Sequence, residues 1–179
     1  MIDATGIKLR MDISDDSKDS LIAALLSESI DVVGHRLGVT ISGTSIIEKR
    51  TFKSGSHVLS LPIESITSIT ETVDETTTDI TANCSWTLNT VNVVAYGSLQ
   101  YGGSYLTFTY TTTTKTINIL SRLVARICIY ELMKTPAFNN FAFTKSMSDN
   151  GGGVSYASDK DVQDDITREL ALIKPGVIM

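Results

Sequence analysis

The sequence has few of the residues that staple small proteins or carry out chemistry. Its two cysteines, Cys84 and Cys128, stand far apart, which excludes a disulfide framework and a cysteine-rich zinc site. Its two histidines, His35 and His57, do not stand at metal-ligand spacing from any other ligand. A chain of 179 residues does not need disulfide bonds or a bound metal for stability, because it can bury roughly two-thirds of the surface that its unfolded form exposes.

Long apolar runs and an excess of cations are also lacking. No apolar stretch reaches the ~18 residues of a membrane span, and no basic-then-apolar leader opens the chain. The formal net charge is −5 and the sequence pI is about 4.9, which argues against a protein that grips nucleic acid. These absences predict a soluble globular domain made in the cytosol, with no membrane partner.

The motifs of common catalytic sites are missing as well. No Gly-x-Ser-x-Gly elbow occurs, and Gly151 to Gly153 lack the Lys-Ser/Thr that follows in a P-loop, so they are interpreted as a hinge. The acidic turn from Asp74 to Asp79 lacks the alternating ligands and the glycine of an EF-hand. The sequence therefore predicts no enzyme, no catalytic residue, no metal site and no cofactor.

What the chain does contain is a threonine-rich middle between two apolar-periodic ends. Ile22, Leu26, Ile30 and Val33 recur at helical spacing and predict a helix over 17–37. From residue 44 to residue 110 the period falls to two, which predicts five or six short antiparallel strands. These predicted strands span residues 45–52, 57–62, 63–69, 86–88, 91–94 and 105–110.

A second helix is predicted over 117–134 and is apolar on most of its sides, which is typical of a helix surrounded by other elements or other chains. Asn118, Arg122 and Arg126 form its one polar stripe. This stripe is either a contact with a partner or the solvated side of the helix.

The C-terminal part combines an irregular stretch with a last helix. The stretch carries more aromatic side chains than a solvated loop usually exposes: Phe138, Phe141, Phe143 and Tyr156. The last helix is predicted over 159–174 and leads to an apolar tail, Val177, Ile178 and Met179. These aromatic and tail residues, with Ile173, Arg122 and Arg126, are the candidate contacts with partners or sister copies; their alternative role is packing within the same subunit.

The predicted fold class is α+β: a small helical bundle of three main helices, with an antiparallel β insertion between the first and second. The predicted segments are an N-terminal helix (1–43), the β insertion (44–114), a long central helix (115–136), an extended arm (137–158) and a C-terminal helix with its tail (159–179).

The order of several short motifs resembles phage head–tail connector (adaptor) proteins. Arg50-Thr51-Phe52 is followed by Leu59-Ser60-Leu61-Pro62 and then by Ile63-Glu64-Ser65-Ile66-Thr67-Ser68-Ile69. The strand Leu106–Tyr110, the long apolar helix and the stretch Gly153–Ser158 before the last helix also look like the family's. The chain departs from the family in two places. The run Thr111–Thr114 stands where many members carry a proline-containing turn, and the region from Val73 to Gln100 is longer than is usual in the family.

The resemblance implies a structural virion protein located in the phage neck and made in the host cytoplasm. Members form a ring, typically a dodecamer, that joins the capsid portal protein to the tail or to a tail-terminator or stopper protein. DNA passes through the lumen without specific binding, which suits an acidic chain. A ring built from heterologous contacts needs two different sticky faces on each subunit.

Two other functions remain open from the residues alone. Trp86, Tyr96, Tyr101 and Tyr105 among threonine-rich strands are compatible with a carbohydrate-binding or adhesin-like β module. A small hydrolase would need His57 within hydrogen-bond reach of a serine other than its chain neighbour Ser56.

Overall fold

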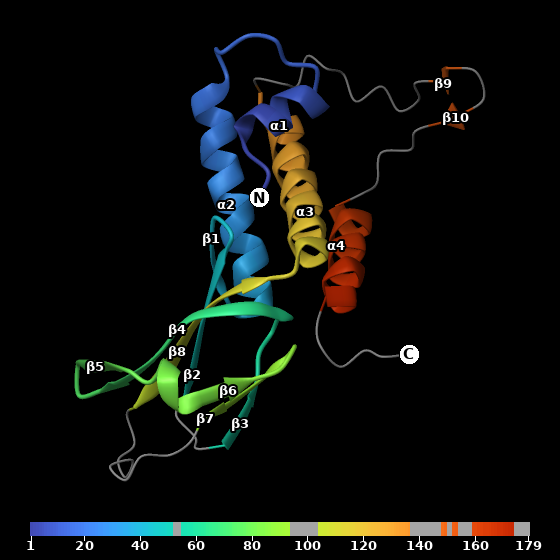
Figure 1. Ribbon diagram of the computed structural model, residues 1–179. Helices are drawn as coiled ribbons and strands as arrows, with labels where there is room; N and C mark the ends of the chain where they lie inside the picture. Colours follow the sequence, from blue (N-terminus) through green and yellow to red (C-terminus); the bar gives the residue numbers. More distant parts are fainter. Residues whose placement is uncertain (52–54, 94–103, 137–147, 150–151, 154–158, 174–179) are drawn as a thin grey trace. The chain divides into compact units, whose positions relative to one another are not determined.

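The computed structural model describes residues 1–51, 55–93, 104–136, 148–149, 152–153 and 159–173 (Figure 1). It is a mixed α+β structure that divides into two compact units. The sheet unit comprises the described residues within 31–120, together with Met1 and Ile173. The helical unit comprises the described residues within 2–30 and 121–172. Both long helices pass from one unit into the other, because their bounds cross residues 30 and 120.

Four α-helices lie in the described chain: α1 (Ala4–Arg10), α2 (Asp19–Leu37), α3 (Thr114–Lys134) and α4 (Asp159–Ile173). The three predicted helices are confirmed, with ends shifted by a few residues. Helix α1 was not predicted, because seven residues are too few to show a helical period. Its ends are nevertheless well defined: the Asp3 carboxylate accepts the Gly6 N–H at 2.8 Å, and Lys8 forms ion pairs with Asp16 and Asp19.

Helix α3 buries part of its apolar surface within the chain itself. Its apolar residues with at most 7% exposure are Leu120, Leu123, Val124, Ala125, Ile127, Cys128 and Leu132. The sequence led us to expect surplus apolar surface on this helix, available to other chains. The chain itself covers the buried set, whereas five other large apolar side chains of α3 are partly exposed: Ile117, Ile119, Ile129, Tyr130 and Met133.

A five-stranded antiparallel sheet forms the larger layer of the sheet unit, in the order β1-β2-β8-β4-β5. Its strands are β1 (Thr40–Ser42), β2 (Ser45–Thr51), β4 (Ile63–Val73), β5 (Thr76–Asp79) and β8 (Tyr105–Thr112). Strand β8 lies at the centre and pairs with β2 on one side and β4 on the other.

Strand β8 shows the two faces of this sheet most clearly. Leu106, Phe108 and Tyr110 are fully buried on the inner face. Thr107 and Thr109 lie on the opposite face, which is only partly covered. The alternation predicted for 105–110 is therefore confirmed, and threonine occupies the half-exposed side that suits a β-branched polar residue.

A second antiparallel sheet, in the order β3-β7-β6, packs against the inner face of the first. Its strands are β3 (Gly55–Val58), β6 (Cys84–Trp86) and β7 (Thr90–Val93), and the short 3-10 helix η1 (Thr81–Asn83) precedes β6. His57 of β3 lies with its ring centroid 5.5 Å from that of Phe108 in β8. The core of the sheet unit thus forms between the two sheets.

The predicted fold class, a small helical bundle with a β insertion, is wrong. Eight strands in two antiparallel sheets form a compact unit with a core of its own, so the β region is no appendage. The reason is the number of inward-facing apolar side chains between residues 59 and 110, which include Leu59, Leu61, Ile69, Val91 and Val93. These residues can enclose a core without help from a bundle.

Individual strands also differ from the expected ones. The strand predicted over 57–62 ends at Val58, and the following residues run outside any strand. The turn predicted over 74–79 is confined to Asp74 and Glu75, with φ of 45° and 68°, and Thr76–Asp79 is strand β5. Strands β9 (Ser148–Asp149) and β10 (Gly152–Gly153) form a small antiparallel pair inside the predicted arm. The division into five segments stays a prediction.

Candidate functional site

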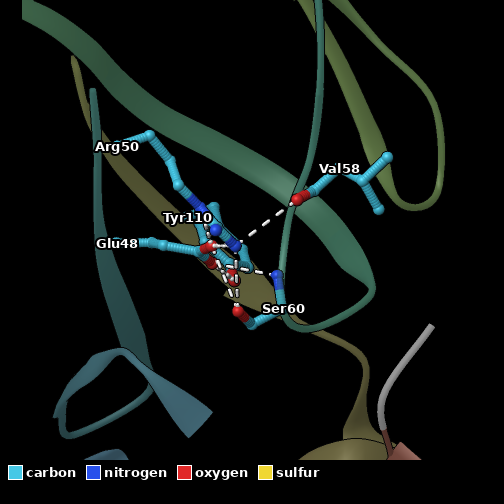
Figure 2. A network of polar contacts seen from close by, with 5 residues as sticks. All are labelled: Glu48, Arg50, Val58, Ser60 and Tyr110. Carbon is cyan, nitrogen blue, oxygen red and sulfur yellow. Dashed lines mark hydrogen bonds and ion pairs between the residues drawn. The ribbon is translucent and has the colours of Figure 1, made fainter. Parts of the chain in front are cut away.

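The buried carboxylate of Glu48 lies at the centre of a polar network in the sheet unit, and its side chain is 0% exposed (Figure 2). Its Oε2 accepts hydrogen bonds from the Tyr110 hydroxyl at 3.1 Å and the Ser60 N–H at 3.0 Å. Its Oε1 accepts from Arg50 Nε at 2.7 Å and the Ser60 hydroxyl at 3.1 Å. Both carboxylate oxygens are therefore paired, as a buried charge requires.

The strand period places these side chains together. In β2, Ile46, Glu48 and Arg50 are alternate residues and so share one face. Glu48 lies opposite Phe108 of β8, one position away from Tyr110 on the same face. Ser60 arrives from the segment that follows β3.

Arg50 neutralises Glu48 and extends the network to the outside. Its guanidinium forms an ion pair with Glu48, while 43% of its side chain remains exposed. Arg50 Nη2 also reaches the Ser60 hydroxyl at 3.3 Å and the Val58 carbonyl oxygen at 3.5 Å. Figure 2 shows these groups converging on the segment between Val58 and Ser60.

The same environment keeps Tyr110 in its neutral form. Burial raises the pKa of the Tyr110 hydroxyl far above its ordinary value, and the adjacent negative charge of Glu48 raises it further. The hydroxyl thus stays a hydrogen-bond donor at any physiological pH. Because Glu48 is sealed from solvent, its carboxylate serves to fasten the backbone segment around Ser60.

This network brings together two segments that the sequence analysis singled out separately. Arg50 opens the Arg50-Thr51-Phe52 motif, and Ser60 lies within Leu59-Ser60-Leu61-Pro62. Leu59 and Leu61, on either side of Ser60, are buried at 1% and 0% exposure. The segment therefore inserts two leucines into the core while Glu48 holds the polar residue between them.

Two of the predicted contact residues, Arg122 and Arg126, bind a carboxylate of their own chain. Arg122 Nη2 lies 3.2 Å from Glu169 Oε2, and Arg126 Nη1 lies 3.1 Å from Glu169 Oε1. The arginines are 53% and 44% exposed, whereas Glu169 is 15% exposed. They therefore connect α3 with α4 inside the helical unit.

The remaining predicted contact residues divide into two groups. Ile173, the last residue of α4, is 5% exposed and packs within its own chain. The others lie outside the described residues: Phe138, Phe141, Phe143, Tyr156, Val177, Ile178 and Met179.

The histidine and the cysteine that were considered as reactive groups, His57 and Cys128, are buried within the fold. His57 is buried against Phe108, whereas its neighbour Ser56 is exposed and bonds with Asn92. Cys128 is a buried free thiol whose pKa burial raises to about 11. Within the part of the chain that is described, no three His, Cys, Asp or Glu side chains cluster closely enough to hold a metal ion.

Of the aromatic residues proposed for a sugar-binding face, the two that are described belong to different sheets. Trp86 belongs to β6 of the small sheet, and Tyr105 belongs to β8 of the large sheet. Tyr96 and Tyr101 lie outside the described residues. No helix in the described ranges has the length and apolarity needed to cross a membrane.

Sequence reasoning missed Glu48 and Glu169, although a signal existed for the first. Glu48 stands two residues after Ile46, at a position that the alternation of the strand turns inward. A charged residue at such a position means either that the two faces of the strand have been assigned the wrong way round or that a buried polar network surrounds it. Glu169 gave no comparable signal, because acidic residues are common on solvated helix faces.

Comparisons with known proteins give remote structural likenesses only. No family model matches the chain, and no curated protein matches it. One solved structure with a similar chain is described as the neck of an empty GTA particle; it has 12% identity and a TM-score of 0.49, covering 94% of this chain and 88% of the other. Another, the virion of a native gene transfer agent particle, has 13% identity and a TM-score of 0.46, covering 93% and 88%. At such low values, neither likeness establishes a common function.

Proposed function

We propose that this chain is a structural subunit of a phage-like neck: a head–tail connector that forms a ring between the capsid portal and the tail. In this role it acts by holding other proteins together and has no catalytic step and no cofactor. Its chains are made in the host cytoplasm and end up in the virion neck. Its partners are sister copies, the portal protein and a tail, tail-terminator or stopper protein.

The observation that carries the proposal is the meeting of the two motif segments at Glu48. Arg50 and Leu59–Pro62 are neighbouring motifs in the order that resembles the connector family. In the structure they share one buried carboxylate, which ties β2 to the segment after β3. The residues that carry the resemblance thus help to hold the sheet unit together. The resemblance therefore involves residues of the core and is not limited to residues scattered over the surface.

The surface of the described residues also suits a subunit that assembles. Six large apolar side chains are at least 36% exposed: Leu9, Val32, Val58, Trp86, Leu88 and Tyr105. Exposed apolar side chains become stabilising when a neighbouring chain covers them. The net charge of −5 supports passage of DNA through the ring, because an acidic wall repels phosphate.

The predicted contact residues keep their place in this proposal. Phe138, Phe141, Phe143 and Tyr156 would supply an arm, and Val177–Met179 a second contact. Ile173 is the exception, because it is buried in its own chain. Arg122 and Arg126 would meet a partner with the exposed parts of their side chains while their charges remain engaged with Glu169.

The test is to mix the purified protein with isolated portal rings and to image the mixture by negative-stain electron microscopy. We expect a second ring stacked coaxially beneath the portal, with an open lumen. Portal rings that remain bare at micromolar concentrations of a folded protein would contradict the proposal. The protein alone, imaged in parallel, shows whether the ring forms before or upon contact with the portal.

A further inference from the structure

The outer face of the five-stranded sheet, which points away from the core of the sheet unit, is coated with hydroxyl groups. Leu106, Phe108 and Tyr110 of β8 face inward, so the residues between them face outward. Residues that pair directly across neighbouring strands share a face, which extends this assignment to β2, β4 and β5. We name these paired outward residues the hydroxyl face, because all are serine or threonine except Ile47, Lys49, Asp79 and Tyr105.

Charge is scarce on the hydroxyl face, although charged residues make up 20% of the sequence. Lys49 and Asp79 are its only charged members, and Glu64 falls at a bulge of β4 without a partner in β8. The two charges stand at opposite ends of one row across the sheet: Lys49 pairs with Thr107, Thr107 with Thr70, and Thr70 with Asp79. Depletion of charge is the compositional mark of the core of a protein interface.

A face with this arrangement is complementary to a second copy of itself. A hydroxyl group both donates and accepts hydrogen bonds, so two hydroxyl faces satisfy each other. A two-fold axis that runs parallel to the strands, between β8 and β4, places β2 of one copy opposite β5 of the second. Lys49 then faces Asp79 of the second copy, and the axis repeats the pair. Stacked sheets cross at about 30°, which displaces the two positions by a distance that a lysine side chain can span.

The surroundings of both charged residues suit this pairing. Asp79 Oδ1 accepts the Thr81 N–H at 2.8 Å and the Thr81 hydroxyl at 2.6 Å, so Oδ2 can accept from a second copy. These bonds hold the pKa of Asp79 below its ordinary value, which keeps its charge at neutral pH. Lys49 Nζ lies over the ring of Tyr105, 5.1 Å from its centroid. That position disfavours a sugar as the occupant, because Tyr105 is the one aromatic ring of the hydroxyl face.

We infer that the hydroxyl faces of two copies stack about this two-fold axis, with Lys49 of each copy paired with Asp79 of the other. The inference goes beyond the proposed function, because an isologous contact does not propagate around a ring. It joins free copies, or copies that belong to two separate rings. Four strands about 4.8 Å apart and about seven residues long offer roughly 450 Å² per copy, which is small for a specific interface. The association is therefore weak and depends on concentration.

Sedimentation velocity across a range of protein concentrations tests the inference. The native chain should show two-fold associates whose fraction rises with concentration. Lys49→Glu places a negative charge against Asp79 of the second copy at both ends of the contact, so we expect association to weaken about ten-fold or more. Lys115→Glu is the control, because it changes the net charge equally but lies in α3, off the sheet. It should leave the association unchanged.

A charge swap and a central substitution locate the contact more closely. Lys49→Glu combined with Asp79→Lys restores opposite charges across the axis and should recover the association. Within one copy these positions lie three strand spacings apart, about 14 Å, so the recovery cannot come from a pair inside one chain. Thr107→Arg puts a charge at the middle of the face and should abolish association without touching Asp79. Urea unfolding of each variant confirms that it is folded.

The remaining outcomes separate this inference from the proposed function. A folded chain that stays single at every concentration but stacks onto portal rings would overturn the inference and leave the connector role intact. Equal weakening by Lys49→Glu and Lys115→Glu, or no effect of Thr107→Arg, would also overturn it. Loss of portal binding in Thr107→Arg, with self-association unchanged, would assign the hydroxyl face to the portal instead. Two-fold association that responds as expected in a chain that ignores portal rings would support the inference and contradict the proposed function.

Discussion

At Glu48 a charged side chain occupies a position that the strand period reserves for an apolar one. The fold tolerates it because every nearby donor is aimed at it: the Tyr110 hydroxyl, the Ser60 N–H and hydroxyl, and the Arg50 guanidinium. A buried ion pair of this kind is weak evidence for net stability, but removing one partner is costly. The network acts as a register lock, since only one alignment of the segment around Ser60 satisfies the carboxylate.

Tyr110 offers the mildest test of this lock. Tyr110→Phe keeps the ring in the core but removes one donor to Glu48, so we expect the free energy of unfolding to fall by about 1–3 kcal/mol. Tyr105→Phe is the matched control on the same strand, because Tyr105 is 36% exposed on the other face. It should change stability by less than about 0.5 kcal/mol. Urea denaturation of both variants measures the difference, and equal effects would refute the lock.

At the scale of single elements, the end of α2 shows a constraint that only the structure reveals. The chain turns back at Gly38, with φ of 73°, and the Val39 N–H donates to the Gly34 carbonyl oxygen at 2.9 Å. A Cβ atom on Gly34 would lie 2.6 Å from the Val39 carbonyl oxygen. The helix therefore needs glycine there for close approach of the following backbone, although glycine is a poor helix former.

Gly34→Ala should consequently destabilise the protein despite the better helix propensity of alanine. Overpacking against backbone costs about 1–3 kcal/mol, which exceeds the gain of at most ~1 kcal/mol from propensity. Ser27→Ala, on the exposed side of the same helix, is the control and should be neutral within about 0.5 kcal/mol. Thermal or urea unfolding distinguishes the two. A stabilised Gly34→Ala variant would contradict this expectation, because it would show that the backbone at Val39 can move away from the added Cβ atom at little cost.

The elements that the sequence predicted well are the ones with many repeats of a single period. Helices α2, α3 and α4 and strand β8 belong to this class, because each repeats its apolar positions over several turns or pairs. Helix α1 and strand β1 are too short for a period. The segment after β3 was mistaken for strand because Leu59 and Leu61 alternate with polar residues, yet Ser60 bonds to a carboxylate instead of a neighbouring strand.

At the scale of the whole molecule, the fold class could not be derived from local periods. Whether strands form an appendage or a separate unit depends on how two sheets face each other, as His57 and Phe108 do, and this contact joins residues far apart in sequence. Likewise, the sequence of α3 does not show which of its apolar side chains its own chain buries, such as Leu120 and Leu123, and which stay partly exposed, such as Ile119. Among the described residues, the exposed large apolar side chains are spread over helices α1 and α2, strand ends and a turn: Leu9, Val32, Val58, Trp86, Leu88 and Tyr105.

The central claim is that this chain assembles with copies of itself into the ring of a viral neck. The most direct measurement is the native mass of the purified protein across a range of concentrations. Each copy has a mass of 19.4 kDa. We expect a closed oligomer whose mass is a fixed multiple of that value. A folded species of 19.4 kDa at every concentration, unchanged when portal rings are added, would contradict it.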